Sequence, residues 1–199
     1  MSTPLETPSD DPIALLRIWI AEATESEPND PCAASLATAT WNGYPSVRMV
    51  LIKTVDEDGL SFYTNAGSRK GQELAVNPLA AICFHWKTLR RQIRIEGAVS
   101  MLPLGIVDHY FHSRSRGSQI AAAVSKQSAP LESRERLLSA VAEYSRAVED
   151  REVPLPADWR GYVLKPTSVE FWADGKDRLH DRVHFTKSQG GWLSERLYP

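Results

Sequence analysis

The sequence predicts an α+β fold built on an antiparallel barrel or sheet. Three observations carry this prediction: strand-like segments occupy both ends of the chain, the middle reads as helical, and no internal repeat interrupts this order. With 199 residues, of which 42% are hydrophobic, the chain suits one domain with a substantial core. We therefore expect a disordered tail at residues 1–11 and a single domain over residues 12–199.

The N-terminal half predicts one helix followed by a block rich in strands. Asp11 as N-cap and Pro12 at the first helical position begin a helix that ends near Ala23. The pairs Asn42-Gly43 and Asp58-Gly59 are turn signals between β-compatible runs. Ser68 caps a short helix that must stop before Pro78. The expected strands are 33–40, 46–55, 60–64, 79–86 and 92–101.

The second half predicts helices first and strands afterwards. Helices are expected at 104–113, 118–125 and 130–148, and the last has apolar residues at helical spacing. Gly117 is expected to interrupt the helical run and to let Ser118 cap the next helix. After a linker marked by Pro154 and Pro156, strands are expected at 161–165, 168–172, 178–185 and 191–197.

Composition restricts the classes of partner. The formal net charge of −2 gives no bulk attraction to nucleic acid or to an anionic membrane, so local positive charge favours a small anionic ligand. Cys32 and Cys83 lack metal-ligand spacing and are expected to be buried thiols in a reducing compartment, with no metal site. No leader or membrane-spanning run is recognisable, so we expect a cytoplasmic protein.

Cationic groups are concentrated near the C-terminus. If 178–185 is a strand, Arg178, His180 and Arg182 share one face, because side chains alternate along a strand. These groups repel one another unless anions lie between them, and guanidinium groups bind phosphate or carboxylate in a bidentate manner. The segment therefore predicts a site for a phosphorylated ligand. The alternative is a charged edge strand that prevents aggregation.

Two further segments could bind phosphate. Arg69 and Lys70 lie in the first turn of the helix capped by Ser68, where two cations oppose the helix dipole unless an anion binds. Tyr110 and Arg114 are spaced for one helix face, with Ser118 beside the next helix start. The alternatives are a solvated helix start and ordinary capping residues.

Three further segments with neutral polar side chains, or with charged residues at the ends of an apolar run, are candidates for ligand binding. Gln92 and the pair Gln127-Ser128 offer donors and acceptors suited to the edge of a heteroaromatic ring. Arg48 and Lys53 end an apolar strand and differ in parity, so they could meet two ligands, or the segment could be a core strand with extended charged ends. The motifs G-x-S-x-G, H-E-x-x-H, G-x-G-x-x-G and the P-loop are absent. This pattern suits an enzyme whose cofactor performs the chemistry.

Eight short motifs follow one another along the chain. They are Arg48-Met49-Val50-Leu51-Ile52-Lys53, Phe62-Tyr63-Thr64-Asn65, Ser68-Arg69-Lys70, Arg91-Gln92-Ile93-Arg94, Tyr110-Phe111-His112-Ser113-Arg114, Ser125-Lys126-Gln127-Ser128, Glu170-Phe171-Trp172 and Arg178-Leu179-His180-Asp181-Arg182. In this order they resemble the pyridoxine/pyridoxamine 5′-phosphate oxidase family, and the resemblance extends from about residue 12 onward. The C-terminal sequence from Arg196 to Pro199 is also similar to that family's Arg-Leu-x-Pro terminus.

The resemblance implies an FMN-binding split β-barrel with peripheral helices, working as a homodimer with FMN at the subunit interface. The matching positions imply that FMN is held by Arg48, Met49, Val50, Leu51, Ile52, Lys53, Tyr63, Thr64, Arg69, Lys70, Gln92, Gln127, Ser128, Trp172 and Arg182. They imply that the substrate, a phosphorylated B6 vitamer, is held by Lys53, Tyr110, Arg114, Ser118, Arg178, Leu179 and His180.

The implied reaction is hydride transfer from C4′ of the vitamer to flavin N5, followed by reoxidation with O2 that gives hydrogen peroxide. Arg178 and His180 would position the reacting carbon, and Asp30 is a weaker candidate for assisting proton removal, its alternative role being that of a turn residue. Two departures are Ser115, where relatives often have proline, and three alanines at 121–123 in place of Gly-Ala-Trp. The alternatives are a related split-barrel flavin oxidase for another ring, as in phenazine biosynthesis, and a flavin- or pyridoxal phosphate-binding protein with little catalysis.

Overall fold

The computed structural model describes residues 11–199, so the predicted tail at 1–11 lies outside the described residues except for Asp11. The helices are α1 (Pro12–Ser26), α2 (Arg69–Val76), α3 (Leu104–Ser113), α4 (Arg116–Val124), α5 (Arg134–Val148) and the 3-10 turn η1 (Lys176–Arg178). The strands are β1 (Ala33–Ala39), β2 (Pro45–Leu51), β3 (Thr54–Asp56), β4 (Gly59–Asn65), β5 (Leu79–Trp86), β6 (Arg91–Met101), β7 (Trp159–Ala173), β8 (Asp181–Ser188) and β9 (Gly191–Arg196).

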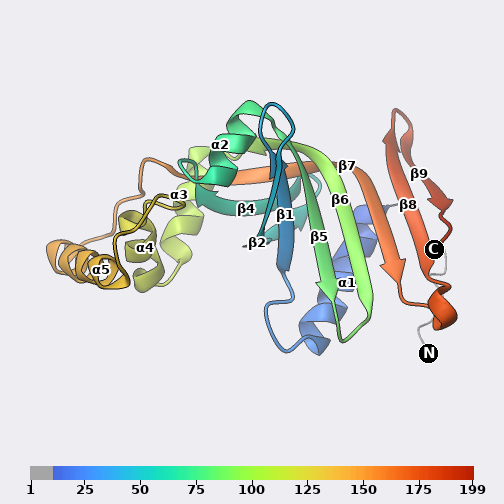
Figure 1. The fold of residues 1–199 in the computed structure, drawn as a ribbon, viewed down its shortest axis with the longest axis horizontal. Coiled ribbons are helices and arrows are strands. Elements are labelled where there is room, and N and C mark those ends of the chain that lie inside the picture. The colour runs from blue at the N-terminus through green and yellow to red at the C-terminus, as the bar shows by residue number, and fades with distance from the viewer. Residues whose placement is uncertain (1–10) are drawn as a thin grey trace.

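All nine strands form one antiparallel sheet that curls into an open half-barrel (Figure 1). The strand order is β2-β1-β5-β6-β7-β4-β3, and β8 and β9 extend from β7 outside this path. The long strand β7 makes the branch possible, because its first half pairs with β4 and its second half pairs with β8. The α+β fold on an antiparallel barrel or sheet that the sequence predicts is therefore confirmed, and so is the split barrel with peripheral helices that the resemblance implies.

The bend between the two halves of the barrel lies at a β-bulge. The register of β6 against β7 shifts between Glu96 and Gly97. A Cβ atom on Gly97 would lie 2.0 Å from the carbonyl oxygen of Lys165, so only glycine fits there. Pro166 is paired opposite Gly97, where the absence of a backbone N–H costs least. This explains why 161–165 and 168–172, predicted as two strands, are parts of one bent strand.

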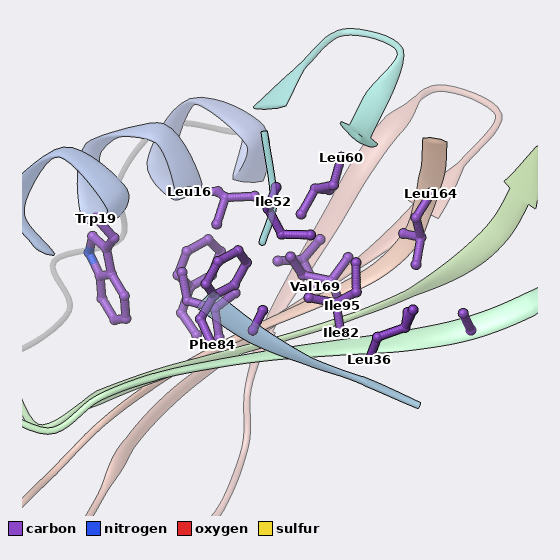
Figure 2. Packing of buried hydrophobic residues seen from close by; sticks show 14 of the residues in the cluster. Leu16, Trp19, Leu36, Ile52, Leu60, Ile82, Phe84, Ile95, Leu164 and Val169 are labelled. Carbon is purple, nitrogen blue, oxygen red and sulfur yellow. The ribbon is translucent and has the colours of Figure 1, made fainter. Parts of the chain in front are cut away.

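The larger core lies between α1 and the sheet (Figure 2). The helix begins as predicted, with the Asp11 carboxylate accepting a hydrogen bond from the N–H of Ile13 at 2.9 Å and Pro12 at the start. Leu16 and Trp19 of α1 belong to the cluster formed with sheet residues that include Phe84 and Phe171. Burial of these side chains is the main stabilising contribution of this part of the fold.

A second, smaller core joins α3, α4 and α5 to the start of β7. These helices gather at one end of the molecule, opposite β8 and β9 (Figure 1). The buried members are Val107, Phe111, Ile120, Val148, Val153 and Trp159. The two cores place the end of β4, the start of β7 and the helices α3 and α4 around one hollow.

Several predicted boundaries are wrong; the predicted helix 130–148, for example, begins only at Arg134, after its cap Ser133. The predicted strand 46–55 is divided into β2 and β3 because Ile52 turns into the core, where its N–H donates to the carbonyl of Cys32. The predicted helix 118–125 begins at Arg116, because Ser115 is its cap, and Gly117 lies inside it. The predicted strand 178–185 begins only at Asp181.

Among the described residues, no helix is long and apolar enough to span a bilayer.

Candidate active site

A cavity of about 640 Å³, called here the main cavity, opens between β2, β4 and the helices α3 and α4. It gathers most of the predicted flavin and substrate residues, although they come from distant parts of the sequence. The predicted residues in its wall are Met49, Val50, Leu51, Lys53, Tyr63, Thr64, Lys70, Tyr110, Arg114, Ser118 and Gln127.

Lys70 is a buried cation in the wall of the main cavity. Its side chain is held in the first turn of α2, and the residue is 8% exposed. The ammonium donates to Thr64 Oγ1 at 3.1 Å and to Gln127 Oε1 at 3.0 Å, which are both neutral. Burial lowers the pKa of Lys70, and the charge of Arg48 lowers it further. A buried ammonium with neutral partners favours an anionic ligand.

Arg114 is the second cation of the main cavity. Its guanidinium lies 5.1 Å from the ring centre of Trp159, and its Nη1 atom is buried without a hydrogen-bond partner among the described residues. Burial lowers the pKa of this guanidinium. An orphaned buried donor is costly unless a ligand accepts from it. Ser118 lines the same wall, with its hydroxyl 2.9 Å from that of Ser115.

Aromatic rings connect the predicted flavin side of the cavity to the predicted substrate side. The Tyr63 and Tyr110 rings stack at 4.0 Å, and Tyr63 also stacks on Trp159 at 5.4 Å. Burial raises the pKa of Tyr63, and proximity to Tyr110 adds to this effect. Sequence reasoning missed Trp159. Its only local signal is an aromatic residue at the start of a strand after a proline-marked linker, which does not reveal its contact with Arg114.

Glu73 is a second residue that sequence reasoning missed. It is 4% exposed and accepts hydrogen bonds from four side chains of β1, β2 and α2, namely Thr38, Ser46, Arg48 and Arg69. Burial raises the pKa of Glu73, but these hydrogen bonds outweigh burial and lower it to about 2. The carboxylate therefore joins two of the three arginines predicted to bind FMN, Arg48 and Arg69.

A smaller hollow of about 270 Å³ adjoins the main cavity and shares Asn65 and Gln127 with it. Arg69 and Ser128, both predicted to bind FMN, line this hollow. The Arg48 guanidinium instead donates to the carbonyl of Leu36 at 3.2 Å, to Thr38, to Ser46 and to Glu73. The Ile52 side chain lies in the core. The flavin roles of Arg48 and Ile52 remain predictions.

Arg178 and His180 lie in a separate cavity, called here the second cavity, of about 1020 Å³. They do not share a strand face with Arg182, because Asp177 and Arg178 adopt left-handed φ values of 56° and 65° before β8 begins. The predicted single row of three cationic groups is therefore wrong. Leu179 is 73% exposed between them.

A row of direct cross-strand neighbours lies on the sheet face opposite the core. It consists of Gln92 on β6, Trp172 on β7 and Arg182 on β8. Glu170 accepts from Arg182 at 2.9 and 3.1 Å, and the remaining guanidinium nitrogen donates to the carbonyl of Tyr198 at 2.7 Å. The Trp172 ring lies 4.6 Å from the His180 ring, which links this row to the second cavity.

Asp30 lies apart from the three hollows described above. It is exposed in the turn before β1 with a φ of 33°, and its carbonyl accepts from the N–H of Ala33 at 2.8 Å. This geometry matches the alternative role of a turn residue. Its catalytic role stays a prediction.

Comparison with known families gives two matches that together cover most of the chain. The pyridoxamine 5′-phosphate oxidase model matches residues 20–149, and the pyridoxine 5′-phosphate oxidase C-terminal dimerisation region matches residues 159–199. The second match contains Trp159 as well as Arg178 and His180.

Similar proteins agree with these matches. Proteins from Rhizobium johnstonii and Brucella anthropi, both named pyridoxine/pyridoxamine 5′-phosphate oxidase, are 51% identical over 97% of this chain and 95% and 96% of their own lengths. PhzG from Burkholderia lata, solved with tetrahydrophenazine-1-carboxylic acid, has a TM-score of 0.92 and 34% identity over 98% of this chain and 95% of its own.

A more distant structure supports the fold alone. The pyridoxamine 5′-phosphate oxidase-related, FMN-binding protein of Nostoc punctiforme has a TM-score of 0.77 and 18% identity, covering 96% of this chain and all of its own. With two family models in register and relatives at half identity over nearly the full length, the chain belongs to the pyridoxine/pyridoxamine 5′-phosphate oxidase family.

Proposed function

We propose that this protein oxidises pyridoxine 5′-phosphate and pyridoxamine 5′-phosphate to pyridoxal 5′-phosphate, with FMN as cofactor and O2 as electron acceptor. The observation that carries the proposal is that Lys70, which is buried, and Arg114, which is half-buried, lie in the wall of one cavity and have no carboxylate partner among the described residues. Two such cations match two ligands that each bear a phosphate. The family membership supports the same reading.

Lys70 fits the flavin phosphate, because Arg69 and Ser128 line the hollow that adjoins it. Tyr63, Thr64 and Gln127 would contact the same cofactor from the wall of the main cavity. When bound, FMN would take a hydride from C4′ while the substrate's O–H or N–H loses a proton, and O2 would accept the two electrons and two protons to give hydrogen peroxide. Oxidation of pyridoxamine 5′-phosphate would give an imine, and addition of water to that imine would give pyridoxal 5′-phosphate and ammonia.

Arg114 fits the phosphate of the vitamer, with Lys53, Tyr110 and Ser118 in the same wall. The orphaned Nη1 atom supplies a donor that no protein group satisfies among the described residues. Stacking on Trp159 holds the guanidinium in place, so little side-chain entropy is lost when phosphate binds. These residues would bind and orient the substrate, and orientation is their contribution to the rate.

Arg178 and His180 would act on the substrate from a second protomer. Within one protomer they line a different cavity from Arg114. The matched dimerisation region includes both residues. We infer a homodimer in which the second cavity of each protomer completes the main cavity of its partner, with FMN at the interface.

A related oxidase for a phenazine-type ring is the second candidate, because of the similarity to PhzG. The compound bound in that structure, tetrahydrophenazine-1-carboxylic acid, carries no phosphate, so a substrate of this kind would not need the buried Arg114 donor as a phosphate site. Oxygen uptake with FMN-loaded protein separates the candidates. We expect uptake with both phosphorylated vitamers and little with unphosphorylated pyridoxine or pyridoxamine.

Two results would overturn the proposal. Yellow protein that consumes no oxygen with either phosphorylated vitamer would indicate a binding protein. Equal rates of oxygen uptake with phosphorylated and unphosphorylated vitamers would show that Arg114 does not bind a substrate phosphate.

The variants Arg178→Ala and His180→Ala should lower turnover while FMN stays bound. Loss of flavin from either variant would show that these residues hold the cofactor instead.

A further inference from the structure

Arg69 is an exposed arginine that is held through one nitrogen only. Its side chain is 62% exposed at the start of α2, and it lines the smaller hollow together with Ser128. Its Nε atom donates to Oε1 of Glu73 at 2.9 Å, and among the described residues neither terminal nitrogen makes a hydrogen bond. Because the guanidinium is planar and rigid, the bond at Nε restricts the directions in which the terminal nitrogens point.

Glu73 is itself held by the sheet, because α2 packs against β1 (Figure 1). The residue is buried, and its Oε2 atom accepts a hydrogen bond from the Ser46 hydroxyl at 2.6 Å. The same oxygen accepts from Arg48 at 3.2 Å and from the Thr38 hydroxyl. These three donors leave Oε1 for Arg69. One buried carboxylate therefore attaches the exposed guanidinium to two strands of the sheet.

Arg48 and Arg69 share this carboxylate but differ in what they can still bind. Both terminal nitrogens of Arg48 donate to protein groups, Nη1 to the carbonyl of Leu36 and Nη2 to Glu73, each at 3.2 Å. Arg69 keeps an edge with two terminal nitrogens, which is the arrangement that binds phosphate in a bidentate manner. Arg48 thus neutralises the buried carboxylate, and Arg69 is left for a ligand.

We propose that Glu73 is a positioning residue for the cofactor phosphate: its Oε1 atom holds Nε of Arg69, so that the terminal nitrogens of this arginine are presented to the phosphate of FMN. This inference rests on the proposed function, in which Arg69 and Lys70 hold that phosphate. A long side chain that is already held loses less entropy when the ligand binds, which is worth about a three- to tenfold difference in affinity. Glu73 would thus strengthen the binding of an anion although it is an anion itself.

Glu73→Gln tests the proposal, because positioning and charge predict opposite results. By Coulomb's law alone, removal of a negative charge beside Arg69 would tighten the binding of FMN, which is an anion. Glutamine has one oxygen and one NH2 group. We expect the oxygen at the place of Oε2, where three donors point, so the NH2 group meets the Nε–H of Arg69, donor against donor, and releases it.

The dissociation constant of FMN is measured by flavin fluorescence on the flavin-free, full-length protein. We expect FMN to bind Glu73→Gln about three- to tenfold more weakly than the wild type. Binding as tight as in the wild type, or tighter, would overturn the proposal.

Riboflavin separates a lost phosphate contact from a damaged site, because it is FMN without the phosphate. We expect Glu73→Gln to change the dissociation constant of riboflavin by less than about twofold, so that the variant discriminates less between the two flavins. An equal loss of affinity for both flavins would show a general defect of the flavin site and refute the positioning role.

A double-mutant cycle tests whether Glu73 acts through Arg69. In the Arg69→Ala background, we expect Glu73→Gln to cause no further weakening of FMN binding. The same three- to tenfold loss in that background, to within about twofold, would overturn the proposal, because Glu73 would then act without Arg69.

Asp158→Asn is the matched control. The Asp158 carboxylate lines the same hollow and accepts from the side-chain amide of Asn65 at 2.7 Å, but among the described residues it forms no ion pair with an arginine. We expect FMN to bind this variant no more weakly than the wild type. An equal weakening in Asp158→Asn and Glu73→Gln would show a general effect of neutralising a carboxylate near the hollow and refute the proposal.

Hydrogen exchange at arginine Nε–H groups, followed by NMR in the flavin-free wild type, gives a readout that needs no variant. We expect the Nε–H of Arg69 to exchange about tenfold more slowly than that of the exposed Arg134, whose side chain makes no hydrogen bond among the described residues. Equal exchange rates would overturn the inference.

The proposed function and this inference fail in different ways. If the wild type binds FMN but consumes no oxygen with either vitamer, the proposed oxidase function fails, and the flavin affinities still decide the role of Glu73. If oxygen is consumed but Glu73→Gln binds FMN as tightly as the wild type does, the inference fails and the proposed function stands.

Discussion

Acidification should remove one identifiable contribution to stability, that of the Glu73 carboxylate. Glu73 is 4% exposed, and its folded-state pKa of about 2 lies well below the ordinary value of 4.5. A group whose pKa is lowered by folding stabilises the protein above its unfolded-state pKa. This contribution is complete above pH 4.5 and is lost as the pH falls from 4.5 through about 2.

The size of the effect follows from the pKa difference. The interval between 4.5 and about 2, at about 1.4 kcal/mol per pH unit, gives up to about 3.5 kcal/mol. Glu73→Gln keeps the volume and one acceptor but cannot carry the charge. Because protonated glutamate resembles glutamine, the stabilities of the two proteins should differ most near pH 7 and converge near pH 2.

Urea denaturation of the flavin-free proteins, followed by tryptophan fluorescence between pH 7 and pH 2, measures this difference. Both proteins must be compared at one protomer concentration, because association contributes to the apparent stability of a dimer. Other carboxylates titrate in both proteins and cancel in the comparison. A difference in the free energy of unfolding that stays constant from pH 7 to pH 3 would refute the reasoning.

Three further predictions concern the flavin site and the two cores. Arg69→Ala should weaken FMN binding about tenfold to a hundredfold, measured by flavin fluorescence on the apoprotein, and full flavin occupancy after purification would contradict this. Gly161→Ala places a Cβ atom 2.8 Å from Cε1 of Tyr63 and should cost about 1–3 kcal/mol, which an unchanged melting temperature would exclude. Leu16→Ala, at a fully buried position of α1, should cost about 2–5 kcal/mol in urea denaturation, and a cost under about 1 kcal/mol would show that the site repacks.

Features with a local cause could be predicted from the sequence. Asp11 and Ser68 cap their helices as expected, because an N-cap bonds to an N–H only two or three residues away. The turn at Gly43 has the positive φ of 87° that its Asn-Gly signal indicates. The fold class followed from the same local signals taken in order, since strands at both ends with helices between them leave few architectures.

Features that depend on distant partners could not be predicted. Glu73 acquires its role from Thr38, 35 positions away, and Trp159 from Arg114, in a different element. The predicted row of Arg178, His180 and Arg182 failed because side chains alternate between faces only where the backbone is extended. Asp177 and Arg178 are not glycines, the residues that usually indicate a left-handed φ. The local sequence therefore does not predict the turn before β8.

The separation of Arg178 and His180 from Arg114 has a thermodynamic consequence for the proposed homodimer. If each site is completed by the second cavity of the other protomer, a vitamer contacts both chains and binds the dimer more tightly than it binds a lone protomer. Linkage then requires that the vitamer strengthen the association of the protomers by the same factor.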